Sequence, residues 1–273
     1  MLLYNGDFIL EKELSLPLSN RAFQYNDGFF ETVVVVNGKL RFWGDHVARL
    51  HDAAKSMKLQ LPSSFSEAAF EDKLLQLAEQ NGAGKYGRLK LKIWRSGAGL
   101  YTPETSTVEW LATVAPTVPT SGKSISIGIC QSIKTISSPL SHFKGPNAAI
   151  YVMAGVEKQQ TNYNDMLLLN AQGMVAELIS SNIFWLMDGK LFTPALDTGC
   201  VNGIVRRNIV RWCHSNSIKL QEAYFTPQRL LQAEAVFAAN VTGIKSINSI
   251  NGEAVSINER FIEQLRLDLD MRV

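Results

Sequence analysis

The chain has 273 residues, of which 46% are hydrophobic and 19% charged, and its formal net charge is only +2. This composition is that of a folded globular protein, and it excludes collagen, coiled coil and general disorder. The near-balanced charge argues against a basic surface for nucleic acid or membranes, and no run reaches the roughly 18 apolar residues that a membrane helix requires.

The first 115 residues alternate strand and helix signals. The pairs Asn5-Gly6 and Asn37-Gly38 lie between apolar runs and predict tight hairpins, because Asn-Gly tolerates the positive φ of a type I′ turn. Apolar residues on one helical face predict a helix over 46–57. The other predicted elements here are strands at 2–4, 8–10, 32–36, 40–43, 86–94 and 109–114 and a helix over about 64–80.

Residues 116–122 hold two prolines and a glycine and predict a linker, because proline cannot donate to a β-ladder. The order of elements predicts an α+β protein with a small N-terminal domain, 1–115, and a larger C-terminal domain, 123–273. The elements predicted after the linker are strands at 124–130, 166–169, 183–186, 191–192, 235–238 and 245–250 and helices at 148–161, 204–215, 227–232 and 259–269.

Lys144 lies in an irregular stretch with small and apolar neighbours, just before a predicted helix. Desolvation lowers the pKa of an ammonium group, so a lysine in such a place can act as an amine nucleophile. Taken alone, a loop lysine is more often a surface residue.

Glu177 has mostly apolar neighbours, so we expect a partly buried carboxylate that needs a cationic or hydrogen-bonding partner. A protonated ring nitrogen of a cofactor would serve, and so would an arginine in a structural ion pair.

A helix begins after Gly203, and the free N–H groups of a helix start attract anions. Arg49 could bind the same anion through its guanidinium fork. Both signals are weak alone, since every helix has an N-terminus and Arg49 also suits a solvated helix face.

The sequence lacks the common motifs for nucleotide binding, metal binding and disulfide frameworks. The glycine-rich loop at 95–103 follows neither common nucleotide-binding spacing. His46 and His51 are five residues apart and do not form an i, i+4 metal pair, so we expect no metal site. The cysteines, Cys130, Cys200 and Cys213, match neither a disulfide framework nor a zinc motif, and the N-terminal residues do not resemble a signal peptide. We therefore expect a reduced, cytoplasmic setting.

Together these fragments resemble the class-IV aminotransferase family, the fold-type IV pyridoxal-phosphate enzymes. The similarity follows the chain order through YNDGFFET at 25–32, NG at 37–38, HxxRL at 46–50, KxxN at 144–147, Glu177 ahead of SNIF at 181–184, GxLFTP at 189–194 and NGI at 202–204. The resemblance implies pyridoxal 5′-phosphate as cofactor and a smaller N-terminal α/β sandwich domain followed by a larger, pseudo-barrel-like domain that binds it.

The resemblance also implies roles for single residues. Lys144 would be the Schiff-base lysine and would carry the proton between the cofactor and the substrate Cα. Glu177 would pair with the pyridinium nitrogen and keep the ring an electron sink. Arg49 and the backbone N–H groups of Ile204 and Val205 would hold the phosphate.

The chain departs from the family in two places. The phosphate-binding Ser or Thr of many members is replaced within FAANVT at 237–242, so we expect Asn240, Thr242 or a backbone N–H there. The Tyr that often follows the lysine motif and holds the cofactor's phenolic oxygen is replaced by Ala148, and Tyr151 stands three residues later.

Three activities share this scaffold: branched-chain aminotransferase, D-amino-acid aminotransferase and 4-amino-4-deoxychorismate lyase. D-amino-acid aminotransferases trap the substrate carboxylate with a Tyr and an Arg-x-His pair. Here Phe30 lacks the hydroxyl, and residues 97–101 contain neither Arg nor His. The glycine-rich loop from Arg95 to Tyr101, the segments 192–204 and 231–235, and the compact length resemble the lyases.

The sequence thus predicts a lyase that forms p-aminobenzoate and pyruvate, with Phe30, Arg95 and Tyr101 near the substrate. The alternatives are an aminotransferase acting on branched-chain or other amino acids with 2-oxoglutarate, and a non-catalytic binding protein on the same scaffold. The family resemblance implies a homodimer with its pocket at the subunit interface and a small-molecule substrate. We expect neither nucleic acid nor membrane as a partner.

Overall fold

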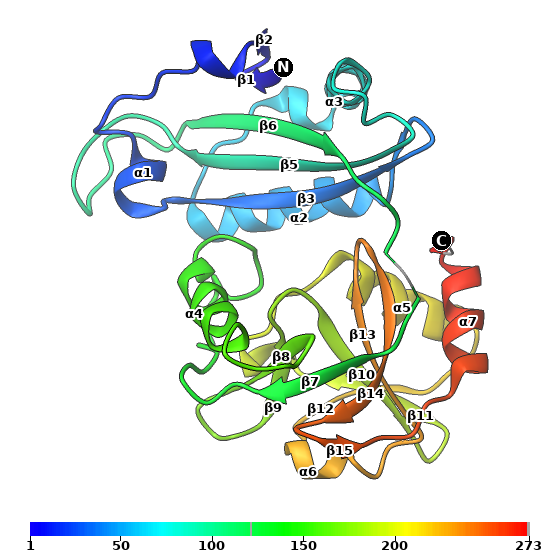
Figure 1. The fold of residues 1–273 in the computed structure, drawn as a ribbon. Coiled ribbons are helices and arrows are strands. Elements are labelled where there is room, and N and C mark those ends of the chain that lie inside the picture. The colour runs from blue at the N-terminus through cyan, green and yellow to red at the C-terminus, as the bar shows by residue number, and fades with distance from the viewer. Residues whose placement is uncertain (121, 272–273) are drawn as a thin grey trace. The chain divides into compact units, whose positions relative to one another are not determined.

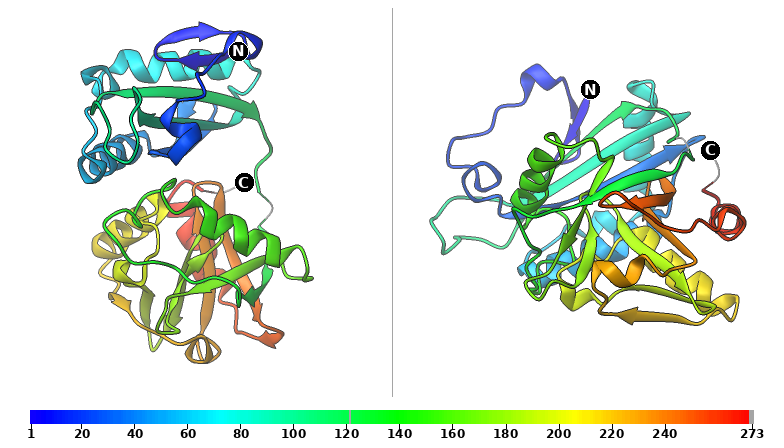
Figure 2. Two further views of the ribbon diagram at one scale, coloured as in Figure 1. Left: turned by 90° about the vertical axis from the view of Figure 1, so that its left-hand side faces the viewer. Right: turned by 60° about the horizontal axis from the view of Figure 1, so that its bottom comes forward.

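The computed structural model describes residues 1–120 and 122–271 (Figures 1 and 2). Ser121, in the predicted linker, and residues 272–273, at the end of the predicted second domain, lie outside the described residues. The chain forms two compact units. Unit 1 contains Met1–Pro119 and Phe143–Pro146, and unit 2 contains Thr120–His142 and the residues from Asn147 onward. The division falls inside the predicted linker, but the short segment with Lys144 groups with the first unit.

Unit 1 is built on a six-stranded sheet in the order β2-β1-β6-β5-β3-β4, in which every described pairing is antiparallel. Two longer helices, α2 and α3, pack on one of its faces (Figure 1). The elements are β1 (Leu2–Tyr4), β2 (Asp7–Ile9), α1 (Arg21–Tyr25), β3 (Gly28–Val36), β4 (Lys39–Leu40), α2 (Trp43–Met57), α3 (Ala68–Gln80), β5 (Tyr86–Arg95) and β6 (Val108–Pro116), with 3-10 turns at Glu11–Glu13 and Ser63–Ser66.

The period-two alternation of β5 explains its part in the core of unit 1. Leu89, Leu91 and Ile93 are fully buried together with residues of α2 and α3. Both Asn-Gly turns form as predicted, with positive φ at each asparagine. The predicted strand over 40–43 is wrong beyond Leu40, because Phe42 has a φ of 57° and α2 begins at the next residue.

Unit 2 is built on a mixed sheet in the order β12-β11-β10-β13-β14-β7-β8-β9, and β15 pairs with β14. The sheet curls, so that β9 at one end approaches β10 (Figure 1). Its strands are β7 (Ile125–Ile129), β8 (Asp165–Leu169), β9 (Val175–Leu178), β10 (Asn182–Met187), β11 (Lys190–Pro194), β12 (Leu220–Ala223), β13 (Ala235–Asn240), β14 (Gly243–Ile250) and β15 (Glu253–Ala254).

The helices of unit 2 are α4 (Ala148–Lys158), α5 (Ile204–Ser215), α6 (Pro227–Leu230) and α7 (Glu259–Asp268), with a 3-10 turn at Leu196–Thr198. The concave side of the sheet encloses an apolar core around Trp185, Val236 and Ile247. A smaller apolar cluster lies between α4 and β8. The α+β class predicted from the sequence is confirmed. No helix within 1–120 and 122–271 combines the length and apolar character needed to cross a bilayer.

Candidate active site

Lys144 is held against β3 of unit 1 by its neighbours. The Phe143 ring packs into the core of unit 1, and the carbonyl oxygen of Lys144 accepts a hydrogen bond from the N–H of Phe30 at 2.8 Å. Gly145 has a φ of 131°, and a Cβ there would lie 2.7 Å from the Cα of Phe29, so only glycine fits. The backbone that carries the predicted lysine is therefore fixed, and its side chain is half-buried.

Arg49 belongs to a buried charge cluster. Its Nε and Nη2 donate to the two oxygens of Glu31 at 2.7 and 2.5 Å, and Nδ1 of His46 lies 2.6 Å from Glu31 Oε2. Burial opposes ionisation of Glu31, but the Arg49 charge and the His46 hydrogen bond outweigh it and lower the pKa of this carboxyl to about 2. The predicted phosphate-binding arginine is thus charge-balanced and oriented by a glutamate.

Besides burial, the positive charge of Lys144 lowers the pKa of His46, which belongs to the same cluster. Burial lowers the pKa of His46, Glu31 opposes this, and the positive charges of Arg49 and Lys144 lower it further. Neutral His46 then donates from Nδ1 to Glu31, and its Nε2 has no hydrogen-bond partner among the described residues. Unit 1 therefore brings together three predicted residues: Phe30, Arg49 and Lys144.

Arg95 and Tyr101 lie at the two ends of the glycine-rich loop. All three guanidinium nitrogens of Arg95 are engaged, with Asp27 Oδ2 and with carbonyl oxygens of Met57, Lys58 and Thr105. This buried arginine connects several segments of unit 1. Contact between Arg95 and the substrate stays a prediction, and such a contact would replace some of these hydrogen bonds. Tyr101 is 92% exposed.

Sequence reasoning missed Arg21, which organises this loop. Arg21 Nη1 donates to the carbonyl oxygens of Ala98, Gly99 and Leu100, and its Nε donates to Asp27 at 2.7 Å. Asp27, part of the DGFFET motif, thus joins two arginines. The local sequence does not show that Arg21 binds this loop, because the three carbonyl groups lie almost eighty residues away.

Glu177, on β9 of unit 2, is buried, and its described hydrogen bonds come from a phenol, a backbone N–H and an amide. Its Oε1 accepts from the Tyr151 hydroxyl at 2.7 Å and from the N–H of Val201 at 3.0 Å. Nδ2 of Asn182 lies 3.5 Å from Oε2 and donates to the carbonyl oxygen of Val201 at 2.8 Å. These bonds favour the ionised carboxylate without cancelling its charge.

The same asparagine connects Glu177 to the start of α5. Gly203 is the N-cap and offers no side-chain cap, and a Cβ at Gly203 would collide with Asn182 Oδ1. Ile204 and Val205 open the helix with buried side chains. Unit 2 therefore brings the predicted carboxylate and the predicted anion-binding helix start into one neighbourhood.

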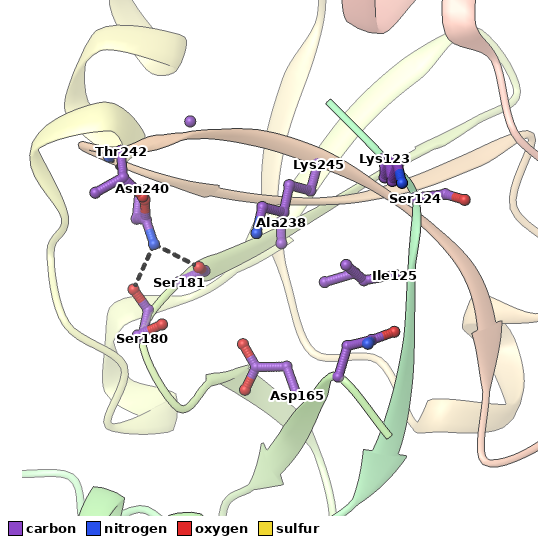
Figure 3. A pocket seen from close by; sticks show the side chains of 12 residues that line it. Lys123, Ser124, Ile125, Asp165, Ser180, Ser181, Ala238, Asn240, Thr242 and Lys245 are labelled. Carbon is purple, nitrogen blue, oxygen red and sulfur yellow. Dashed lines mark hydrogen bonds between the residues drawn. The ribbon is translucent and has the colours of Figure 1, made fainter. Parts of the chain in front are cut away.

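Asn240 and Thr242 lie elsewhere in unit 2. Asn182 pairs with Ala239 across β10 and β13, so the next side chain, Asn240, points to the opposite face of the sheet from Asn182 and Glu177. Asn240 Oδ1 accepts from the N–H and the hydroxyl of Thr242 at 2.8 and 2.6 Å, and its Nδ2 donates to Ser181 Oγ at 2.9 Å (Figure 3). The two residues thus order the turn after β13, and phosphate contact by their side chains stays a prediction.

A cavity of about 470 Å³ opens on that opposite face (Figure 3). Its lining is mostly polar and includes Lys123, Asn164, Asp165, Ser180, Asn240 and Lys245. Because it lies across the sheet from Glu177, it is separate from the neighbourhood of that carboxylate. The described residues contain no group of three or more His, Cys, Asp or Glu side chains placed to hold a metal ion.

Comparison with known proteins identifies the family. The model of amino-transferase class IV matches residues 28–250. An aminodeoxychorismate lyase of Vibrio harveyi is 29% identical over 243 residues, covering 86% of this chain and 88% of that protein. A D-alanine aminotransferase of Bacillus licheniformis is 26% identical over 262 residues, covering 93% and 89%.

The fold comparison agrees. The crystal structure of a branched-chain aminotransferase from Thermoproteus uzoniensis superposes with a TM-score of 0.87 at 21% identity, covering 99% of this chain and 95% of that one. The predicted fold-type IV architecture is therefore confirmed. The chain belongs to the amino-transferase class IV family and is a pyridoxal-phosphate-dependent enzyme.

Proposed function

We propose that this enzyme is a lyase that converts 4-amino-4-deoxychorismate to p-aminobenzoate and pyruvate. The observation that carries the choice is the match to the Vibrio harveyi lyase over 86% of the chain. Phe30 adds support, because its ring lacks the hydroxyl that the D-amino-acid enzymes are expected to use. The Lys90 ammonium lies 4.5 Å from the centre of that ring, and Lys92 pairs directly with Phe30. These two cations suit a substrate with two carboxylates.

The side chains present fit pyridoxal phosphate. Glu177 supplies a buried carboxylate for the ring nitrogen, and the uncapped start of α5 supplies N–H groups for the phosphate. Arg49, oriented by Glu31, supplies a guanidinium suited to a phosphate. Lys144 supplies the amine. When bound, the cofactor provides an electron sink for the pair left at the substrate Cα.

Lys144 performs the proton transfers in both candidate reactions. In the lyase its amine would remove the Cα proton, and the C–O bond would break as the substrate ring becomes aromatic. The departing enolpyruvate would take up a proton from the Lys144 ammonium and become pyruvate. In an aminotransferase the same amine delivers the proton to cofactor C4′ instead. Glu177 keeps a proton on the ring nitrogen in either case.

An aminotransferase is the second candidate, because the Bacillus licheniformis D-alanine aminotransferase matches 93% of the chain at 26% identity. The two are separated by supplying aminodeoxychorismate without any keto acid and measuring p-aminobenzoate. Release at a rate that Lys144→Ala abolishes supports the lyase. Amino-group transfer from branched-chain or D-amino acids to 2-oxoglutarate, without such release, would contradict it.

The lysine assignment has its own readout. The protein with pyridoxal phosphate is expected to show a visible absorbance band, and Lys144→Ala is expected to lose it together with turnover. Turnover should fall at least about a thousandfold, since removing a nucleophile that acts in every step costs several kcal/mol. A band that survives unchanged contradicts the role of Lys144. No band in either protein favours the non-catalytic alternative.

We further propose a homodimer in the cytoplasm. The free thiols of Cys130, Cys200 and Cys213 are all buried, which suits a reducing compartment. Light scattering after gel filtration measures the mass directly, and a species of 30.3 kDa at assay concentration contradicts the dimer.

A further inference from the structure

Tyr151 makes a bond that the family resemblance does not account for. It lies on α4, and its hydroxyl donates to Oε1 of Glu177 on β9 at 2.7 Å. Of the three hydrogen bonds described for this carboxylate, it is the shortest and the only one from a hydroxyl. The ring of Tyr151 packs on the apolar cluster between α4 and β8, so the hydroxyl is fixed by packing as well as by the bond.

The hydroxyl of Tyr151 is a permanent donor. Burial raises its pKa, and the charge of Glu177 raises it further, so it stays protonated throughout the working range of an enzyme. A phenol has one proton to donate. While that proton is given to Glu177, it is not available to a phenolate oxygen of the cofactor.

The ionisable groups described near this pair include Cys200, Arg206 and Glu222. The thiol of Cys200, on the loop before α5, contributes to the raised pKa of Tyr151. Burial and the charge of Glu177 raise the pKa of Cys200 itself to about 12. Arg206 and Glu222 also act on Cys200, and they form an ion pair at 2.9 Å. The Tyr151 bond opposes protonation of Glu177, because the hydroxyl donates to the ionised oxygen.

We propose that Tyr151 is a positioning residue that holds Glu177 ionised and aimed, and so sets how firmly the cofactor's ring nitrogen keeps its proton. This inference rests on the proposed role of Glu177 toward that nitrogen. Donors to a carboxylate stabilise its charged form, and residues behind a ligand-binding group tune that group. Burial alone would favour the neutral acid, which cannot hold a positive ring by charge.

The first test uses the cofactor-free protein and follows the tyrosine ring carbons by NMR as pH rises. Tyr151→Phe identifies the signal of Tyr151. In the wild type this signal should not titrate up to about pH 10.5, above the ordinary tyrosine value. In Glu177→Gln it should titrate at lower pH than in the wild type. An unchanged titration would overturn the pairing, whatever the enzyme's activity.

The second test uses the protein loaded with pyridoxal phosphate. Tyr151→Phe keeps the ring and removes only the hydroxyl, so Glu177 should take up a proton more readily. The acid limb of the kcat/KM profile should move up by about one pH unit, which is the equivalent of one hydrogen bond to a charged group. The visible spectrum should show the same shift, and KM should change less than about twofold.

Tyr163→Phe is the matched control, because Tyr163 packs on the same apolar cluster and is not the donor in any of the three hydrogen bonds described for Glu177. If Tyr151→Phe and Tyr163→Phe give the same spectrum and the same acid limb, the proposal is wrong. If Glu177→Gln leaves the spectrum of the loaded protein unchanged, the proposal also fails, because Glu177 is then not the ring's partner. Failure of the lyase proposal looks different: p-aminobenzoate is not released, while these spectral shifts persist.

Discussion

The described hydrogen bonds of two buried glutamates, one in each unit, come from different kinds of donor. Glu31 is bound by a cation, since Arg49 donates to both of its oxygens. Glu177 is held by a phenol, a backbone N–H and an amide, all of them neutral. Both side chains are 2–3% exposed. The two carboxylates are therefore equally buried, and they differ in their hydrogen-bond donors.

This difference in donors indicates a structural role for Glu31 and a chemical role for Glu177. A carboxylate paired with an arginine neutralises the positive charge of the guanidinium locally and fixes its orientation. Hydrogen bonds from neutral donors stabilise a carboxylate without cancelling its negative charge. From this contrast we expect Glu31 to matter most for folding and Glu177 to matter most for the cofactor. Four measurements test this expectation.

The largest effect should come from Glu31→Gln. Breaking a buried ion pair leaves Arg49 as a buried charge without its carboxylate, and this costs about 3–5 kcal/mol of unfolding free energy. Urea denaturation of the cofactor-free protein measures the loss. The double variant Glu31→Met, Arg49→Met should recover much of it, because neither charge remains. A loss below about 1 kcal/mol would mean that the pair is not structural.

The second largest effect should be the change in unfolding free energy with pH. The pKa of Glu31 is about 2 in the folded protein against an ordinary 4.5. Because the folded value is depressed, the stabilisation is full above pH 4.5 and is lost as pH falls toward 2, by about 3 kcal/mol in total.

His46 acts in the same direction. Its pKa is lowered from 6.5, so stability begins to fall below that pH as the unfolded chain takes up the proton. Denaturation from pH 7 to 3 measures the combined slope. Glu31→Gln should flatten it, and an equally steep profile in that variant would assign the acid sensitivity to other groups.

A smaller loss is expected for Asn182→Ala. This change removes the donor to the buried Val201 carbonyl at 2.8 Å and should cost about 1–3 kcal/mol. It should also loosen the start of α5 and so weaken binding of pyridoxal phosphate. Cofactor affinity equal to that of the wild type would show that Asn182 does not organise the helix start.

The smallest effect on folding should come from Glu177→Gln. The amide oxygen can still accept from Tyr151 and Val201, so the unfolding free energy of the cofactor-free protein should change by less than about 1 kcal/mol. The absorbance of the loaded protein should change clearly, because the negative charge is gone. A loss as large as that of Glu31→Gln would erase the contrast between the two glutamates.

Local sequence was sufficient for most elements. Helix α5 begins after Gly203 and ends at Ser215 as predicted, and both Asn-Gly hairpins form, because turn chemistry and apolar period act over a few residues. Glu31 could also have been recognised. It sits at an inward position of β3 between Phe29 and Val33, where a charge requires a partner, and Arg49 lies on the inward face of α2.

Other features had no local signal. The strand β12 was missed because its exposed Gln221 and Glu222 hide the pattern, and it forms by pairing with β11. The failure at 40–43 has a similar cause, since the chain turns into α2 through the positive φ of Phe42.

Motif order and periodicity predicted the family, the α+β class and the candidate site residues, because these patterns are properties of the chain. The partners of those residues appear first in the folded structure: Glu31 for Arg49, Tyr151 and Asn182 for Glu177, and carbonyl oxygens for Arg95. Those partners are brought together from distant segments by sheet pairing and helix packing. Hydrogen bonds and ion pairs depend on separation in space, and local sequence patterns do not encode that distance.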